Sequence, residues 1–184
     1  ICFVDFFVLE TVCEYIHNWQ KHGKKFIKVS VNMSRTTLRK KNVVQKAVAI
    51  CSKYQIEPQM IEIEITESIG GLEKKLITRL MDDFHAAGFS IALDDFGSGF
   101  SNIAALAEND FDVVKFDKSL IDTIFENDKS RTVIQQAINL CNAVNKNIET
   151  VGEGVETEQQ LQILKEYGCD IGQGYLFSRP IPEE

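Results

Sequence analysis

Long apolar runs are missing from this 184-residue chain. A helix that crosses a membrane needs about 18 or more consecutive apolar residues, and no stretch approaches that length. Residues 1–9 are mostly apolar, but they include Asp5 and lack the basic flank and small-residue cleavage site of a signal peptide. We therefore expect no membrane segment in this chain. Residues 1–9 are predicted to belong to a helix whose start has been cut off.

Clustered cysteines and an excess of positive charge are missing as well. The five cysteines are scattered without CxxC spacing, which argues against zinc and a disulfide framework and fits a reducing, cytoplasmic compartment. His17, His22 and His85 fall on predicted helices or linkers, so they are expected to be surface or packing residues. The net charge of −7 argues against holding DNA or RNA polymers by bulk electrostatics. Any phosphate ligand would need local positive charge, and a metal ion is its simplest source.

What is present is an alternation of short apolar runs with longer helical periods. The chain is 44% hydrophobic and 26% charged, which suits one globular domain over residues 1–184. Strands are predicted over 26–31, 60–65, 89–93, 113–116, 148–151 and 171–177. Helices are predicted over 43–54, 72–87, 101–107, 130–144 and 158–167. This alternation favours an α/β fold with parallel strands.

Polar residues end every predicted strand. They are Asn32, Glu64, Asp94 with Asp95, Lys115 with Asp117, Glu153 and Gln173. In a (β/α)8 barrel the site is built from the carboxyl ends of several strands, whereas a flat doubly wound sheet would spread these groups along a line. We therefore predict a TIM-like barrel. Because such barrels usually have eight strands in about 250 residues, the missing strands are expected upstream of Ile1.

Oxygen donors dominate these strand ends. Carboxylates and an amide without nearby cysteine or histidine select a hard cation, with magnesium or manganese favoured and calcium an alternative. Gly97 and Gly99 should turn the chain so that Asp94 and Asp95 both face inward. Two such close carboxylates repel unless cations lie between them, which indicates a two-metal site bridged by Asp94. Taken alone, the pair is also typical of a turn or a helix cap.

Three neighbouring features have similar alternatives. The FGSGF segment at 96–100 resembles a phosphate-binding loop, but it lacks a P-loop lysine, so a mobile loop over the site is favoured. Lys115 could simply form a structural ion pair with Asp117. Glu153 and Glu156 could belong to the start of the next helix, where acidic side chains suit the dipole.

Six motifs, taken together, resemble the EAL domain family. They are VNMS at 31–34, EITES at 64–68, DDFGSGFS at 94–101, VKFD at 114–117, EGVET at 153–157 and QGYLFSRP at 173–180. Their order and spacing match over essentially the whole chain. The resemblance implies a TIM-like barrel that hydrolyses cyclic di-GMP to linear pGpG with Mg2+ or Mn2+.

The resemblance also implies roles for individual residues. The metal would be bound by Asn32, Glu64, Asp94 and Asp95. The attacking water would be held or activated by Lys115 and Glu153, with Glu67 anchoring the loop at 96–100, which the family also uses in dimer contacts. Substrate and supporting contacts would come from Gln173, Asp117 and Glu156. Cyclic di-GMP and a second copy of the chain are the expected partners.

The chief departure from the family is that the Glu-Ala-Leu signature itself is absent. It is expected upstream of Ile1, together with one metal-binding glutamate and a substrate-binding arginine. We therefore expect a competent domain that is truncated, so that this chain alone is weak or inactive. A sensory or GGDEF-type domain is expected upstream. The alternative is a cyclic di-GMP receptor without catalysis, against which the retained acidic residues argue.

Overall fold

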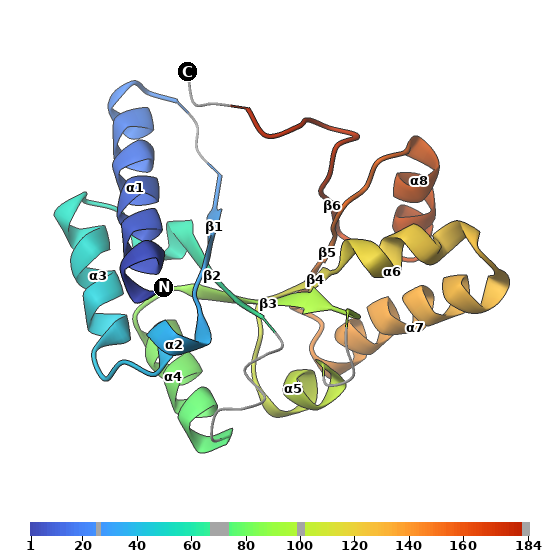
Figure 1. The fold of residues 1–184 in the computed structure, drawn as a ribbon, viewed down its shortest axis with the longest axis horizontal. Helices are drawn as coiled ribbons and strands as arrows, with labels where there is room; N and C mark the ends of the chain where they lie inside the picture. Colours follow the sequence, from blue (N-terminus) through green and yellow to red (C-terminus); the bar gives the residue numbers. More distant parts are fainter. Residues whose placement is uncertain (25–26, 67–73, 99–101, 182–184) are drawn as a thin grey trace. The chain divides into compact units, whose positions relative to one another are not determined.

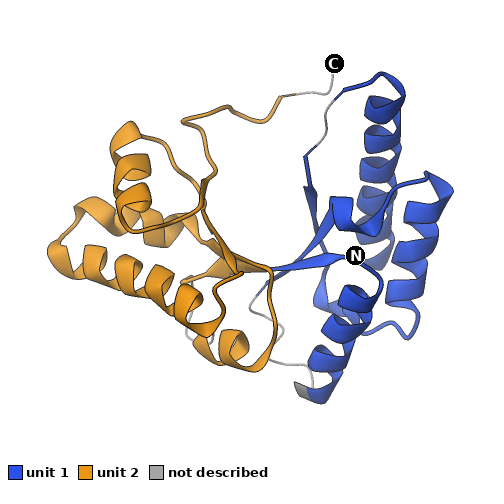
Figure 2. Ribbon diagram, turned by 180° about the vertical axis from the view of Figure 1, so that it is seen from behind, with its two compact units in different colours: residues 1–92 blue, residues 93–184 orange. Residues whose placement is uncertain are grey.

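The computed structural model describes residues 1–24, 27–66, 74–98 and 102–181. Within these ranges six strands follow one another in a single sheet in the order β1-β2-β3-β4-β5-β6, and helices separate them along the chain (Figure 1). The chain divides into two compact units, residues 1–92 and 93–184, which Figure 2 colours separately. The strand β3 (Ser90–Phe96) contains the boundary between them.

Unit 1 opens with the long helix α1 (Cys2–Lys21), followed by β1 (Val29–Asn32), α2 (Arg35–Leu38) and α3 (Val43–Lys53). A short 3-10 turn, η1 (Pro58–Met60), then leads into β2 (Ile61–Thr66), and α4 (Lys74–Ala86) precedes β3. The helix α1 packs against both α3 and β1 (Figure 1). Its buried side chains recur every three or four residues: Phe6, Leu9, Cys13 and Ile16.

In β1 and β2 the parallel register decides which side chains meet. Val31 lies opposite Ile63 and Asn32 lies opposite Glu64. Successive residues of a strand face opposite sides of the sheet, so the isoleucines of β2 share one face and its glutamates share the other. Every residue from Ile61 to Ile65 is buried.

Unit 2 continues from β3 through α5 (Asn102–Glu108), β4 (Val113–Phe116), α6 (Lys118–Asp122) and η3 (Thr123–Phe125). It ends with α7 (Asp128–Val144), β5 (Glu149–Gly152), α8 (Glu158–Glu166) and β6 (Ile171–Gly172). The pairs β4–β5 and β5–β6 are parallel. The helix α8 starts at a capping box in which Thr157 and Gln160 satisfy each other's backbone N–H groups.

Most predicted elements are confirmed, with β4 matching residue for residue and the others shifted at their ends. The expected strand over 171–177 is wrong beyond Gly172. There the chain turns, with Phe177 N donating to Gly174 O at 3.1 Å, while Leu176 N reaches Val155 O at 3.0 Å. The expected first strand begins at Val29, and residue 26 lies outside the described residues. In the described part of the chain no helix is long and apolar enough to span a membrane.

The packing of unit 1 gives a stability prediction. Phe84 is fully buried and meets Phe89 edge-on, with ring centroids 5.5 Å apart. Phe84→Ala should lower the free energy of unfolding by about 3–5 kcal/mol, because it removes apolar contacts and leaves a cavity. Phe3→Ala is the matched control, since Phe3 is 80% exposed, and it should change that free energy by less than about 0.5 kcal/mol. Urea unfolding followed by circular dichroism measures both, and equal losses would contradict the assigned core.

Candidate active site

The predicted residues of unit 1 meet at the ends of β1 and β2. Because Asn32 and Glu64 are register partners on parallel strands, their side chains leave the same face of the sheet. Asn32 Nδ2 donates a 2.8 Å hydrogen bond to Glu64 Oε2, and Met33 N extends the pairing by donating to Glu64 O. The bond uses the amide nitrogen of Asn32, so the amide oxygen is the side-chain atom of Asn32 that has the right chemistry to bind a cation. Glu64 is nearly buried, at 5% exposure.

A second polar pair lies one step earlier on the same face, and the sequence reasoning missed it. Ser30 and Glu62 are also register partners, and Ser30 Oγ donates to Glu62 Oε1 at 2.8 Å. Glu62 is as buried as Glu64. The alternation of residues 60–65 held the signal, because it puts both glutamates on one face. Glu62 thus lies next to the Asn32–Glu64 pair on the same face of the sheet.

In unit 2 the central contact is a partly buried ion pair between Lys115 on β4 and Glu153 just after β5. Lys115 Nζ lies 2.6 Å from Glu153 Oε1, and the two side chains are 7% and 20% exposed. Lys115 pairs in register with Val151, and Glu153 follows two residues later, where Glu153 N donates to Phe116 O. Lys115 thus has Glu153 as an ion-pair partner, whereas the alternative from the sequence was a structural pair with Asp117. Asp117 instead caps α6, accepting from Ser119 N and Ser119 Oγ.

The adjacent acids Asp94 and Asp95 lie inside β3. The sequence reasoning placed the turn at Gly97 and Gly99, but the backbone first departs from the strand conformation at Asp95, whose φ is +58°. Left-handed backbone is uncommon outside glycine, and aspartate is among the residues that tolerate it. Asp95 N donates to Asp94 Oδ1 at 2.9 Å, so the two acids are tied locally. Non-glycine residues in this conformation cluster at functional sites.

The loop after β5 is closely packed against the segment after β6. Gln173 N donates to Gly152 O and Val155 N donates to Gln173 O, so the backbone of Gln173 is fixed beside the Glu153–Glu156 loop, while its side chain is exposed. A Cβ at Gly174 would collide with the backbone of Val155. Glu156 is half-exposed, and Lys118 Nζ contacts it at 3.0 Å. Neither Glu153 nor Glu156 lies in a helix, because Thr157 caps α8.

Glu67 and residues 99–100 of the predicted loop lie outside the described residues. Within the described ranges, no three His, Cys, Asp or Glu side chains gather closely enough to hold a metal ion by themselves. The oxygen donors occur in two sets, Asn32 with Glu64 in unit 1 and Asp94 with Asp95 in unit 2. In both sets the donor type suits a hard cation.

The cysteines and one pocket lie apart from these strand ends. Cys13 on α1 and Cys51 on α3 are buried with their Sγ atoms 3.9 Å apart, and burial raises the pKa of the Cys141 thiol to about 12.

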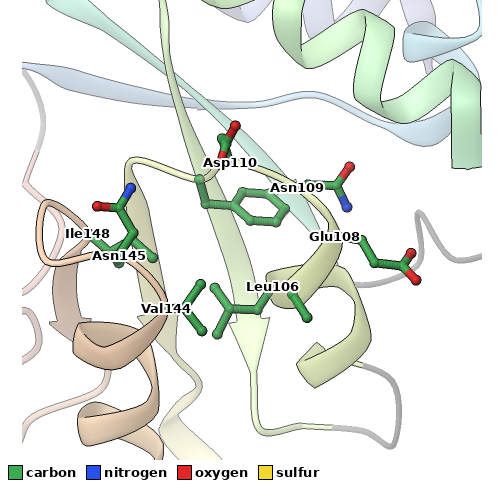
Figure 3. Close-up of a pocket in the computed structure, with 9 residues that line it drawn as sticks. Leu106, Glu108, Asn109, Asp110, Val144, Asn145 and Ile148 are labelled. Carbon is green, nitrogen blue, oxygen red and sulfur yellow. The ribbon is translucent and has the colours of Figure 1, made fainter.

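The pocket has a volume of about 250 Å3 and lies before the amino ends of β4 and β5 (Figure 3). Lys115 and Glu153 mark the opposite, carboxyl ends, so this pocket is separate from the candidate site. It is lined by Leu106, Ala107, Glu108, Asn109, Asp110, Phe111, Val144, Asn145 and Ile148.

Comparison with known proteins shows which family this chain is similar to. A model of the EAL domain matches residues 3–180. The probable cyclic di-GMP phosphodiesterase PdeA of Escherichia coli is 33% identical over 97% of this chain and 24% of its own length. The cyclic di-GMP phosphodiesterase NbdA of Pseudomonas aeruginosa is 30% identical over 97% of this chain and 23% of its own length. The chain therefore spans about a quarter of the length of these curated relatives.

A solved structure extends the likeness to the fold. The PaMucR phosphodiesterase in its c-di-GMP complex matches 97% of this chain and 72% of its own chain, with a TM-score of 0.88 and 26% identity. The predicted fold class is thereby confirmed: this is an α/β fold of the TIM-like barrel class. The chain belongs to the EAL domain family.

The ion pair of unit 2 gives a second prediction. Lys115→Met and Glu153→Gln should each lower the free energy of unfolding by about 3 kcal/mol, because each leaves a poorly solvated charge without its partner. The double variant should lose less than the sum of the two, by about 1–3 kcal/mol, since the pair is coupled. The control is Lys118→Met, which breaks two exposed pairs, with Asp122 at 2.8 Å and with Glu156 at 3.0 Å, and should cost about 1 kcal/mol or less. Strictly additive losses in chemical unfolding would show that Lys115 and Glu153 are not energetically coupled.

Proposed function

We propose that this domain hydrolyses cyclic di-GMP to linear pGpG in bacterial second-messenger signalling. The observation that carries the proposal is the partly buried Lys115–Glu153 pair at the carboxyl ends of β4 and β5. Family membership and the names of the phosphodiesterase relatives support the substrate. In (β/α)8 barrels catalytic groups occupy this end of the strands.

The proposed metal ligands are Asn32, Glu64, Asp94 and Asp95, and the proposed ions are Mg2+ or Mn2+ in a two-metal site. The donor chemistry fits, because amide and carboxylate oxygens are the ligands that these hard cations prefer. When bound, such cations would polarise the phosphodiester and balance its negative charge. The hydrogen bond from Asn32 Nδ2 to Glu64 Oε2 holds the two ligands of unit 1 in a fixed mutual orientation.

Lys115 and Glu153 are proposed to handle the attacking water. The ammonium of Lys115 lies 2.6 Å from the Glu153 carboxylate and so fixes its position. An ionised Glu153 accepts a proton from water as a general base, while the water oxygen bonds to phosphorus and one ester P–O bond breaks. The ribose oxygen of the broken bond leaves and takes a proton from solvent water, and Glu153 returns its proton to solvent, giving the linear dinucleotide. Lys115 also offsets negative charge that develops on the phosphoryl oxygens.

The remaining assignments are finer parts of the proposal. Gln173 is proposed to contact the substrate, which its exposed side chain and fixed backbone suit. Glu156 and Asp117 are proposed to support the site through Lys118, because Glu156 binds the Lys118 ammonium and Asp117 caps the helix that Lys118 begins. Glu67 is proposed to anchor the loop at 96–100. A homodimer, an upstream sensory or GGDEF-type domain and a cytoplasmic location complete the proposal.

The first test is metal dependence. Asp94→Asn should lower the rate of cyclic di-GMP hydrolysis by the full-length protein at least about a hundredfold, because it removes a charged ligand from the proposed two-metal site. Chromatography of pGpG formed in Mg2+ measures the rate. The control is Asp128→Asn, the same change at an exposed acid in the first turn of α7, which should leave the rate unaltered. Hydrolysis by Asp94→Asn at the wild-type rate would rule out the two-metal proposal.

The second test separates an enzyme from a receptor. Glu153→Gln should reduce turnover about 10²–10⁴-fold while leaving the affinity for cyclic di-GMP within about threefold, because the glutamine keeps the shape but cannot take the proton. Glu158→Gln, an exposed change at the start of α8, is the control. Calorimetry and product chromatography on the same samples give both quantities. Tight binding without any turnover in the wild type would make the domain a receptor.

A further inference from the structure

One carboxylate oxygen on α1 accepts three hydrogen bonds from the segment that follows β1. Asp5 Oδ2 accepts from Ser34 N at 2.9 Å, from Ser34 Oγ at 2.6 Å and from Thr37 Oγ1 at 2.6 Å. All of these residues belong to unit 1. Bonds to an ionised acceptor are stronger than bonds between neutral groups, so this is a firm attachment between α1 and the turn after β1.

The attached segment begins two residues after Asn32. Ser34 is the N-cap of α2, and its hydroxyl accepts from Thr37 N while donating to Asp5. Thr37 is completely buried, so its hydroxyl depends on protein acceptors. Although burial raises it, the hydrogen bonds from Ser34 and Thr37 hold the pKa of Asp5 below its usual value. The acid is therefore charged at neutral pH.

The end of β1 is also held by hydrogen bonds to β2. Met33 N donates to Glu64 O at 3.0 Å, and Asn32 Nδ2 donates to Glu64 Oε2 at 2.8 Å. Asn32 thus lies between β2, which holds its side chain, and the Asp5 attachment, which holds the backbone that follows it. Releasing the attachment would allow the end of β1 to shift while leaving the strand pairing itself intact.

We propose that Asp5 is a positioning residue for the metal-binding amide of Asn32. The inference rests on the proposed function, because it takes Asn32 to be a metal ligand. Asp5 would not touch the ion or the substrate. It would act through Ser34 and Thr37, keeping the Asn32 amide oxygen in the orientation a cation needs. Losing an outer partner of this kind typically weakens metal affinity about 10–100-fold.

The test compares Asp5→Ala, Asp5→Asn and the control Glu14→Ala in the full-length protein. Glu14 is an exposed acid on the same helix. Direct binding of Mn2+ by calorimetry should weaken about tenfold or more in Asp5→Ala. It should weaken less in Asp5→Asn, whose amide oxygen still accepts hydrogen bonds, and stay within about twofold in Glu14→Ala. The Mn2+ concentration for half-maximal hydrolysis should rise in parallel, while the rate at saturating Mn2+ should stay within about threefold of wild type.

A purely structural role gives a different result. In that case Asp5→Ala would lower the melting temperature but bind Mn2+ as tightly as wild type, and the inference would be overturned. If Asp5→Ala does not fold, Thr37→Val takes its place, because it keeps the side-chain shape and removes one of the three bonds. Its Mn2+ affinity should fall about threefold, and an unchanged affinity would overturn the inference equally. A wild type that neither binds Mn2+ nor hydrolyses cyclic di-GMP would contradict the proposed function instead.

Discussion

In-register pairing of parallel strands is the constraint on which the candidate site depends. Because parallel partners project from the same face, the register that puts Val31 opposite Ile63 also puts Asn32 opposite Glu64. The apolar pair packs in the core, and the polar pair supplies two of the proposed metal ligands. A slip of one residue would reverse the faces, burying the polar side chains among the helices, so core packing and site geometry enforce the same register. The β4–β5 register does the equivalent for Lys115 and Glu153.

The cost of that arrangement is buried charge. Glu62, Glu64 and Lys115 are all at most 6% exposed. Ionised groups leave water only at a substantial free-energy cost, which partners have to offset. Lys115 has Glu153, Glu64 has the amide of Asn32, and Glu62 has the hydroxyl of Ser30. Both glutamates therefore accept a hydrogen bond from the neighbouring strand, which offsets part of the cost of their burial.

Local patterns were sufficient for most of the long helices and the strands. The alternation of residues 60–65 predicts β2 and, followed to its end, both glutamates of its polar face. Asp117 followed by Ser119 is typical of a helix N-cap, and the interpretation of Asp117 as a site residue missed this signal. Other features are set by tertiary contacts that no local pattern contains. Asp5 meets Ser34 across 29 residues, and the chain leaves β6 after Gly172 because the backbone of Val155 lies against it.

Because Asp95 has a left-handed backbone and Asp94 does not, the same substitution has different effects at the two positions. Asp94 does not have a positive φ, so exchanging it for alanine removes the carboxylate and its hydrogen bond from Asp95 N without straining the backbone of residue 94. At position 95 an alanine would also have to hold φ near +58°, which costs about 1–2 kcal/mol for a residue other than glycine, asparagine or aspartate. An alanine scan would therefore overstate the importance of the second carboxylate. Asparagine, which tolerates the same backbone, separates the charge of Asp95 from its conformation.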